Sequence, residues 1–394
     1  MLSISLDSQI ASSADGRQSL RGDPVERQRR YAAELAGLHV VVKTGRDAPA
    51  GPVPLAANAW AYATRSSSRY TFALDAYRLG ARVCRAEPID LITAQDPFAT
   101  GLVAWLLARR YGRPLNLQVH FDVIDNPYWL RERPEHRALN VLGKWLLRQA
   151  DTVRVGTTRE REHLAALGIP CERIFVAPVP VDLERFGAAH PDETLRRQLG
   201  GDALVLNVSR LVPQKDLPTL LRAAAQVVRG HPGARFAIAG DGPLRPWLET
   251  LATQLALGEH VRFLGNVDRA AVPRLVAAAD ALAVSSVYEG TSLVTVEAAA
   301  AGKPVVTTDV AGAADTIVDG VTGYVVPIGD ATALAGALRR ILANRAKAAQ
   351  MGAAAREHVR QRFSTEPAVA DVIRMWRATA GTRDPRSRTG SSVR

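Results

Sequence analysis

Cysteine is scarce in this chain: its 394 residues include only Cys84 and Cys171. Two such distant cysteines make neither a disulfide framework nor a cysteine-based metal motif, which favours a reducing compartment. No stretch reaches the ~18 to 20 apolar residues of a membrane-spanning helix. The start, MLSISLDSQIASSADG, lacks the basic region and long apolar core of a secretory signal. We therefore expect a cytoplasmic protein.

Acidic residues are fewer than basic ones, 39 against 50, which gives a formal net charge of +11. Residues 1–180 carry 24 Lys and Arg against 18 Asp and Glu, a net +6. A basic excess is typical of proteins that bind nucleic acid, anionic lipid or an anionic substrate. The sequence contains no recognisable nucleic-acid module. Anionic lipid and an anionic substrate therefore remain as partners.

Short apolar runs that alternate with helical stretches fill the C-terminal half. The predicted strands are Ala203–Ser209, Arg235–Gly240, Val261–Gly265, Ala281–Ser286, Pro304–Asp309 and Tyr324–Pro327. Near-continuous apolar strands are typical of a parallel sheet covered on both faces. The pattern predicts a Rossmann-like α/β domain, which binds ligands beyond the carboxyl ends of its strands.

The N-terminal half repeats this pattern less regularly. Its predicted strands are Leu2–Leu6, Leu38–Lys43, Leu91–Ala94 and Leu115–Phe121, again with helices between them. We therefore expect a second Rossmann-like domain. The tail from Gly381 on is polar and basic, which predicts disorder.

The most informative run is E-G-T-S-L-V-T-V-E-A-A-A-A-G-K-P-V-V, which begins at Glu289. It reads as a glycine-bearing turn, a helix and a strand. The start of a helix offers free backbone N–H groups and is an anion site. Eight residues at helical rise would place Glu289 and Glu297 about 12 Å apart. That is too far for the paired carboxylates of a glycosidase, but it suits holding two ends of a long anionic ligand.

Two other predicted strand ends carry chemistry. LNVSRLVPQKD places Arg210 and Lys215 in the loop after a strand, where two cations suit a diphosphate. IAGDGP places Gly240 and Gly242 in a tight turn. Glycine is needed where the backbone turns sharply or approaches a ligand, and the second motif leaves both explanations open.

Together these motifs resemble the retaining glycosyltransferases of family 4, which have the GT-B fold of two Rossmann-like domains with a donor/acceptor cleft between them. The resemblance implies that Glu289 binds the donor sugar and Glu297 the ribose hydroxyls. It assigns the diphosphate to the backbone of Gly290, Thr291, Ser292 and Leu293, and to Arg210 and Lys215. Gly242 then lies near the nucleotide. Ser209 and Asp216 stand where the family usually has glycines.

The resemblance also reaches the N-terminal half. His120, at the end of a predicted strand, matches a family histidine that reaches toward the transferred sugar or the acceptor. Gly22 is the nearest counterpart of a family Gly-Gly loop, although this loop is longer and different here. Asp122 and Asp125 are weaker candidates for acceptor contacts. No pattern requires a metal or another cofactor, since the nucleotide sugar is a substrate.

The resemblance implies four segments. Residues 1–182 form an N-terminal acceptor-side domain and residues 183–364 a C-terminal nucleotide-sugar domain. A helix over 365–380 packs back on the N-terminal domain, and 381–394 form a disordered basic tail. The implied function is transfer of a sugar from a UDP- or GDP-linked donor to a hydroxyl of a lipid-linked or oligosaccharide acceptor, in cell-surface polysaccharide or glycolipid synthesis. A nucleotide-sugar epimerase and an inactive nucleotide-sugar- or glycan-binding subunit remain alternatives.

The stretch around Trp145 allows two interpretations. Leu139, Leu142, Trp145 and Leu146 have helical spacing and alternate with basic residues. Such a helix could rest on anionic lipid at the cytoplasmic face of a membrane. It could equally be an ordinary amphipathic helix that covers the N-terminal sheet.

Overall fold

The computed structural model describes residues 1–11, 24–68 and 71–382. These residues form two compact units. Unit 1 takes the described residues up to Pro178 and those from Ala368 on, and unit 2 takes Val179–Pro367. The division thus falls a few residues before the predicted boundary at 182. Most of the predicted disordered tail, residues 383–394, lies outside the described part of the chain.

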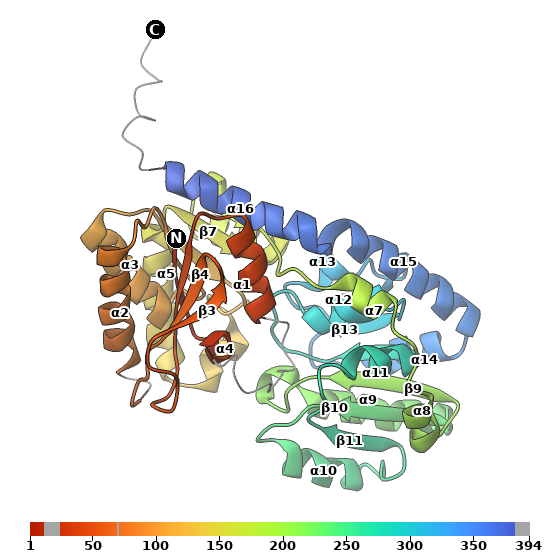
Figure 1. Cartoon of the computed structure of the whole chain (residues 1–394). Helices are drawn as coiled ribbons and strands as arrows, with labels where there is room; N and C mark the ends of the chain where they lie inside the picture. Colours follow the sequence, from red (N-terminus) through yellow and green to blue (C-terminus); the bar gives the residue numbers. More distant parts are fainter. Residues whose placement is uncertain (12–23, 69–70, 383–394) are drawn as a thin grey trace. The chain divides into compact units, whose positions relative to one another are not determined.

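Unit 1 is built on a sheet in the order β3-β4-β2-β1-β5-β6-β7-β8 (Figure 1). All neighbouring strands are parallel except β3 and β4, which form an antiparallel pair. The strands are β1 (Leu2–Ser5), β2 (Leu38–Val42), β3 (Pro52–Ala56), β4 (Ala59–Ala63), β5 (Ile92–Ala94), β6 (Leu115–Val119), β7 (Thr152–Val155) and β8 (Ile174–Val176).

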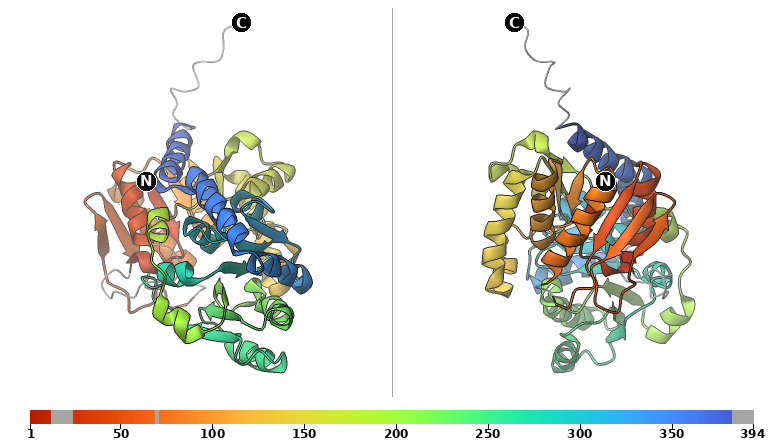
Figure 2. Two further views of the ribbon diagram at one scale, coloured as in Figure 1. Left: turned by 90° about the vertical axis from the view of Figure 1, so that its right-hand side faces the viewer. Right: turned by 60° about the vertical axis from the view of Figure 1, so that its left-hand side comes forward.

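Helices cover both faces of this sheet, as its wholly buried strands β1, β2, β5, β6 and β7 require. One face packs on α2 (Phe72–Ala86), α3 (Ala99–Tyr111) and α5 (Glu135–Gln149). The other packs on α1 (Pro24–Ala33) and α16 (Thr365–Gly381). The short helices α4 (Pro127–Glu132) and α6 (Thr158–Ala166) follow β6 and β7. Figure 2 shows these layers from two further sides.

The helix α16 is attached to the unit 1 sheet by apolar and polar contacts. Trp376 is buried against Tyr31 of α1 with ring centroids 5.0 Å apart, and its indole N–H donates to Asn116 Oδ1 at 3.3 Å. Thr379 and Thr152 share a hydrogen bond of 2.6 Å. These hydrogen bonds satisfy the buried polar groups of Trp376, Thr379 and Thr152 on this face, whereas the buried Tyr31 hydroxyl has no hydrogen-bond partner within the described chain.

Unit 2 is a fully parallel sheet in the order β11-β10-β9-β12-β13-β14. Its strands are β9 (Ala203–Val208), β10 (Ala234–Ala239), β11 (Val261–Gly265), β12 (Ala281–Val284), β13 (Val305–Thr308) and β14 (Gly323–Val326). One face packs on α9 (Leu217–Gly230), α10 (Arg245–Gln254) and α14 (Ala331–Leu342). The other packs on a second set of helices: α7 (Leu183–Gly187), α8 (Glu193–Leu199), α11 (Val272–Ala278), α12 (Leu293–Ala300) and α15 (Arg345–Phe363). The remaining helix, α13 (Ala313–Thr316), follows β13.

The predicted strands all form, within one or two residues of their predicted ends. Four strands were not predicted: β3, β4, β7 and β8. The first two are an edge pair that contains Pro52 and Pro54, and proline weakens a strand pattern. The other two are short, and β7 carries the buried Arg154 where an apolar residue is expected. The local sequence does not predict such strands, because their formation depends on packing against the adjacent strands.

Asp216 joins the turn after β9 to helix α9 in a left-handed conformation, with φ 40° and ψ 49°. This is the position at which the family resemblance leads one to expect glycine. The backbone therefore keeps the shape that glycine would take, at a cost of roughly 1 to 2 kcal/mol for a residue with a Cβ, somewhat less for Asp.

We predict that Asp216→Gly leaves the free energy of unfolding unchanged or raises it by up to about 1 kcal/mol, because glycine removes the steric cost of the left-handed backbone. We expect Asp216→Val to lower it by about 1 to 2 kcal/mol, since β-branching aggravates the same clash. Urea unfolding of both variants measures the difference. Equal losses in the two variants would show that the carboxylate, not the backbone, determines stability here.

Candidate functional site: the carboxyl edge of the unit 2 sheet

The loops that leave β9 and β12 meet at the carboxyl edge of the unit 2 sheet. These strands are neighbours, so parallel pairing brings together two segments separated by about 70 residues in the sequence. Three hydrogen bonds join the loops. Val287 N–H donates to Gln214 O at 2.9 Å. Gln214 Nε2 donates to Tyr288 O at 3.0 Å, and Ser285 Oγ donates to Lys215 O at 2.8 Å.

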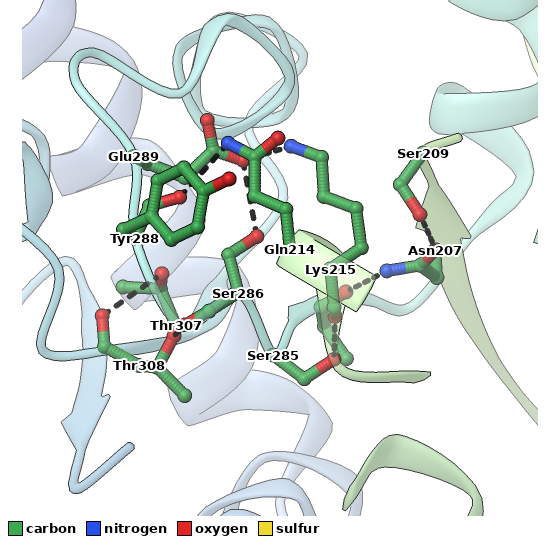
Figure 3. A network of polar contacts seen from close by, with 11 residues as sticks. Asn207, Ser209, Gln214, Lys215, Ser285, Ser286, Tyr288, Glu289, Thr307 and Thr308 are labelled. Atoms are coloured by element: carbon green, nitrogen blue, oxygen red, sulfur yellow. Dashed lines mark hydrogen bonds and ion pairs between the residues drawn. The ribbon is translucent and has the colours of Figure 1, made fainter. Parts of the chain in front are cut away.

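At the centre of this junction lies an ion pair between Lys215 Nζ and Glu289 Oε1 (Figure 3). Both side chains are largely buried, with exposed fractions of 18% and 6%. Ser286 Oγ donates a hydrogen bond of 3.0 Å to the same carboxylate oxygen. Thr308 at the end of β13 donates to Ser286 O at 2.6 Å and so holds the segment that carries the serine. The predicted site residues Lys215 and Glu289 are therefore in direct contact.

Arg210 lies beside this pair in sequence and is exposed at the surface of the β9 loop. Its neighbour Ser209 is anchored, because Ser209 Oγ donates to Asn207 Oδ1 at 2.8 Å and Asn207 Nδ2 donates to Ala283 O at 2.8 Å. The loop base is thus fixed to β12 while Arg210 remains accessible at its surface. This arrangement suits a cation that meets an anionic ligand.

The turn with Gly240 and Gly242 packs directly on the β9 loop. A Cβ at Gly240 would lie 1.9 Å from Ser209 O, and one at Gly242 would lie 2.5 Å from Leu211 O. Leu211 N–H also donates to Asp241 O at 3.0 Å. Close packing of two loops therefore accounts for both glycines without a ligand. The contact of Gly242 with a nucleotide stays a prediction.

Helix α12 starts at Leu293, preceded by Gly290, Thr291 and Ser292. The first N–H groups of a helix have no intrahelical acceptor, and the Ser292 side chain makes no capping hydrogen bond. The helix end therefore offers backbone donors and a positive dipole end just after Glu289.

Glu297 lies on α12, four residues after its first residue. The expectation of two helical turns between the glutamates is wrong, because residues 289–292 are not helical and the 1.5 Å rise does not apply to them. Burial raises the pKa of Glu297 to about 7, against the opposing influence of Arg269 and Arg185. Its carboxyl group makes no hydrogen bond within the described chain, so it is available to a ligand.

In unit 1, His120 follows β6 and is half-buried. Burial, helped by the charges of Arg154 and Arg27, lowers the pKa of His120 to about 3. The imidazole is therefore neutral at neutral pH, with one ring nitrogen able to donate and the other able to accept a hydrogen bond. A neutral imidazole can orient a hydroxyl but cannot act there as a cationic acid.

Two acidic residues near His120 in sequence have different environments. Asp125, with φ 52°, accepts hydrogen bonds from Asn140 at 2.6 Å and Lys144 at 2.8 Å, so it fastens its loop to α5. Asp122 accepts from Asn126 at 3.0 Å, and burial raises its pKa. The acceptor contacts expected of Asp122 and Asp125 stay predictions. The predicted Gly22 lies outside the described residues.

Several groups were missed by sequence reasoning. Ser286 and Gln214 hold the ion pair in place, yet neither belongs to a motif with a recognisable spacing. Glu160 is buried at the start of α6, where its Oε2 accepts from the N–H groups of Gly156 at 2.9 Å and Thr157 at 3.1 Å. Burial and nearby Asp122 raise the pKa of Glu160 to about 8. Its capping-box spacing from Thr157 was the only signal.

Two family profiles match the two halves of the chain. "Glycosyl transferase 4-like domain" covers residues 24–180 and "Glycosyl transferases group 1" covers residues 193–358. A glycogen synthase of Mycobacterium tuberculosis is 30% identical over 300 residues, which is 76% of this chain and 71% of that enzyme. The chain belongs to the group 1 glycosyltransferases of family 4. The family predicted from the Glu289 run is confirmed, and the chain is a member of a family of transferase enzymes.

Another relative is more similar over a shorter region. The GDP-mannose-dependent alpha-(1-6)-phosphatidylinositol monomannoside mannosyltransferase of Mycolicibacterium smegmatis is 35% identical over 218 residues, 52% of this chain. The match spans 57% of that relative's length.

Solved structures bear on the fold alone. A sucrose-phosphate synthase from Thermosynechococcus elongatus has a TM-score of 0.80 at 24% identity, over 96% of this chain and 98% of that one. Anabaena HepE, solved in complex with UDP and glucose, has a TM-score of 0.75 at 21% identity, over 96% of this chain and 100% of that one. The predicted GT-B fold class, two α/β domains with parallel sheets, is confirmed.

We predict that the affinity for a nucleotide sugar rises with pH through about 7, because the ionised Glu297 carboxylate accepts hydrogen bonds better than the protonated form. In Glu297→Gln this rise should disappear, and affinity at pH 8 should fall about tenfold or more. Calorimetric titration with UDP-glucose and GDP-mannose measures both effects. The titrant is a nucleotide sugar and not a free nucleotide, because the terminal phosphate of a free nucleotide titrates near pH 6 and would add its own pH dependence.

The matched control is Glu249→Gln, an exposed carboxylate of the same unit that pairs with Arg245 at 2.8 Å. It should keep the pH dependence of the wild type. A pH dependence that persists in Glu297→Gln would remove Glu297 from the donor site.

Proposed function

We propose that this chain transfers a sugar, with retention of configuration, from a UDP- or GDP-linked donor to a hydroxyl of a lipid-linked or oligosaccharide acceptor, in cell-surface polysaccharide or glycolipid synthesis. The observation that carries the proposal is the buried Lys215–Glu289 ion pair, with the exposed Arg210 in the same loop after β9 and the start of α12 just after Glu289. Lysine, arginine and a helix start are three kinds of group that stabilise a diphosphate.

The proposed reaction breaks the bond between the sugar C1 and the diphosphate oxygen, and forms a bond from C1 to the acceptor hydroxyl oxygen on the same face. The hydroxyl proton passes to the leaving diphosphate. Negative charge grows on that diphosphate as the bond breaks. Arg210, Lys215 and the first N–H groups of α12 would stabilise this charge, as donors in place before the reaction do.

The remaining predicted residues take supporting roles in the proposal. Glu289 holds Lys215 in place and binds sugar hydroxyls, Glu297 accepts from the ribose, and the neutral His120 orients a hydroxyl of the transferred sugar or the acceptor. The relatives support this class of reaction: one is named for a GDP-mannose donor and a phosphatidylinositol mannoside, and another, from Nocardia farcinica, is a D-inositol 3-phosphate glycosyltransferase. We further propose that no divalent metal is needed, since Arg210 and Lys215 supply the positive charge.

Release of UDP or GDP from a panel of nucleotide sugars, with and without candidate acceptors and in the presence of EDTA, tests the proposal. We expect acceptor-dependent release that EDTA leaves unchanged. Conversion of the donor sugar without any acceptor would favour an epimerase. Binding without turnover across the panel would favour an inactive subunit, and activity restored only by Mg²⁺ or Mn²⁺ would contradict metal independence.

A membrane-facing surface is part of the proposal. Of the described helices, none is long and apolar enough to cross a bilayer. Helix α5 buries Leu146 in the unit 1 core but leaves Val141 and Trp145 exposed, at 67% and 41%. The Trp145 ring meets the Trp105 ring of α3 edge-on at 4.8 Å, and Arg109 lies 5.5 Å over Trp105. Paired tryptophans beside arginines suit the interface of an anionic membrane.

We predict that Lys215→Ala and Arg210→Ala each reduce kcat by roughly 10²- to 10³-fold, because each removes a donor to the charge that develops on the leaving diphosphate. Thermal unfolding should show Arg210→Ala as stable as the wild type, since Arg210 is exposed. Lys215→Ala should lower the melting temperature, because it leaves the buried Glu289 carboxylate without its partner. Near-normal turnover in either variant would exclude that residue from the phosphate role.

We predict salt-sensitive binding to anionic liposomes. Residues 1–180 carry a net charge of +6. Each basic residue near an anionic surface contributes about 1 kcal/mol of attraction, which fades within a Debye length of about 8 Å at physiological salt. Trp145→Ala should weaken cosedimentation roughly tenfold, since inserting a large apolar side chain is worth about 1.5 to 3 kcal/mol.

The control is Trp247→Ala, which removes an exposed tryptophan of unit 2 and should bind as the wild type does. Equal binding to neutral and anionic liposomes, or equal losses in the two variants, would contradict a specific surface on α3 and α5.

A further inference from the structure

Unit 1 contains a buried arginine that has no acidic partner among the described residues. Arg154 lies on β7 and is only 3% exposed. Its Nε donates to Ala177 O at 2.7 Å, and its two terminal nitrogens donate to Gln118 Oε1 at 3.0 Å and Pro178 O at 2.9 Å. These three acceptors are neutral amide oxygens. They accept hydrogen bonds from the guanidinium N–H groups but do not neutralise the positive charge of the guanidinium.

A second cation reinforces this charge. Arg27, on α1, is half-buried. Burial is the main cause that lowers the pKa of Arg154 and of His120, and the nearby charge of Arg27 lowers both pKa values further. The neighbouring arginines of α1 are different: Arg29 and Arg30 both pair with Glu26, at 3.9 and 3.2 Å. Across the described chain, no Asp or Glu forms an ion pair with Arg27 or Arg154.

A buried, uncompensated cation is costly, and folded proteins pair such charges or use them to bind anions. The position fits the second use. Arg154 pairs in register with Gln118 on β6, and His120 follows two residues later, at the carboxyl edge of the sheet. Helix α1, which carries Arg27, also begins at that edge, and its start adds a positive dipole end. Ligands of parallel α/β sheets bind at this edge.

We propose that Arg27 and Arg154 bind a phosphate group of the acceptor, so that the acceptor is a phosphate ester rather than a neutral glycan. This inference rests on the proposed transferase function. The donor diphosphate already has its own cations in Arg210 and Lys215 of unit 2. Arg27 contacts the phosphate oxygens directly, for which a planar guanidinium with paired donors is well suited. Arg154 contributes positive charge from the interior of the sheet, where its side chain donates hydrogen bonds to the carbonyls of Ala177 and Pro178.

Calorimetric titration of the full chain with glucose 1-phosphate tests the proposal, with glucose as the neutral control. We expect the wild type to bind the phosphate ester and not the sugar. Arg27→Gln should weaken binding about tenfold or more, the loss expected for a charge-assisted hydrogen bond. Arg27→Lys should retain part of the affinity. The matched control is Arg29→Gln, two residues further along α1 and therefore roughly on the opposite side of the helix, and it should bind as the wild type does.

A second arm separates soluble from lipid-linked phosphate. A polyprenyl monophosphate in detergent micelles is compared with the corresponding polyprenol in the same micelles. Stronger dependence on Arg27 for the lipid than for glucose 1-phosphate assigns the site to a lipid-linked acceptor, and the reverse assigns it to a soluble one. If Arg27→Gln binds every phosphate ester as well as the wild type, or if glucose binds as tightly as glucose 1-phosphate, the proposal is wrong.

Lys215→Ala distinguishes this inference from the proposed function. It should weaken binding of UDP or GDP and leave binding of glucose 1-phosphate unchanged, whereas Arg27→Gln should do the opposite. Loss of glucose 1-phosphate binding in Lys215→Ala alone would place the anion in the donor site and overturn the inference. Unchanged UDP and GDP binding in Lys215→Ala would instead undermine the donor site, whatever Arg27 does.

Discussion

The ion pair between Lys215 and Glu289 joins loops that follow two different strands, and both side chains are largely buried. Such a pair is stable only where hydrogen bonds fix both partners and the surrounding backbone cannot move away. Gln214 and Ser285 meet this requirement by joining the two loops, and Ser286 donates a hydrogen bond to the Glu289 carboxylate from within its own loop. The glycine turn after β10 then packs on the same loop so closely that no side chain fits. The carboxyl edge of the unit 2 sheet is therefore one rigid assembly built around a single ion pair.

Much of this assembly could be predicted from the sequence because its parts are local. The strands of unit 2 are short apolar runs, and the loop cations and the glutamates stand at strand ends and at a helix start, where spacing alone places them. The separation of Glu289 and Glu297 could not be derived in this way. The helical rise of 1.5 Å per residue holds only within α12, which begins at Leu293, and not in the turn that carries Glu289.

Features that depend on contacts between residues far apart in the sequence could not be predicted from local patterns. The strand β7 reads T-V-R-V, and nothing local indicates that Arg154 is buried, because its hydrogen-bond partners come from β6 and from the segment after β8. Asp216 is another case. Its residue type gives no sign of a left-handed backbone, and only the course of the chain between β9 and α9 imposes one. Features determined by distant contacts thus escape prediction, even where the elements that carry them do not.

The two sheets treat buried positive charge in opposite ways, and this difference bears on what each can bind. In unit 2 the charge of Lys215 is paired with that of Glu289. The proposed diphosphate would share Lys215 with this carboxylate and would gain further positive charge from Arg210. In unit 1 the hydrogen bonds of Arg154 to Ala177, Gln118 and Pro178 go to neutral amide oxygens, and the charge of Arg27 adds to that of Arg154. The proposed anion would offset the electrostatic cost of burying this charge. Ligand binding to a folded protein raises its free energy of unfolding. The increase for an anion bound in unit 1 should therefore exceed the increase expected from its hydrogen bonds alone.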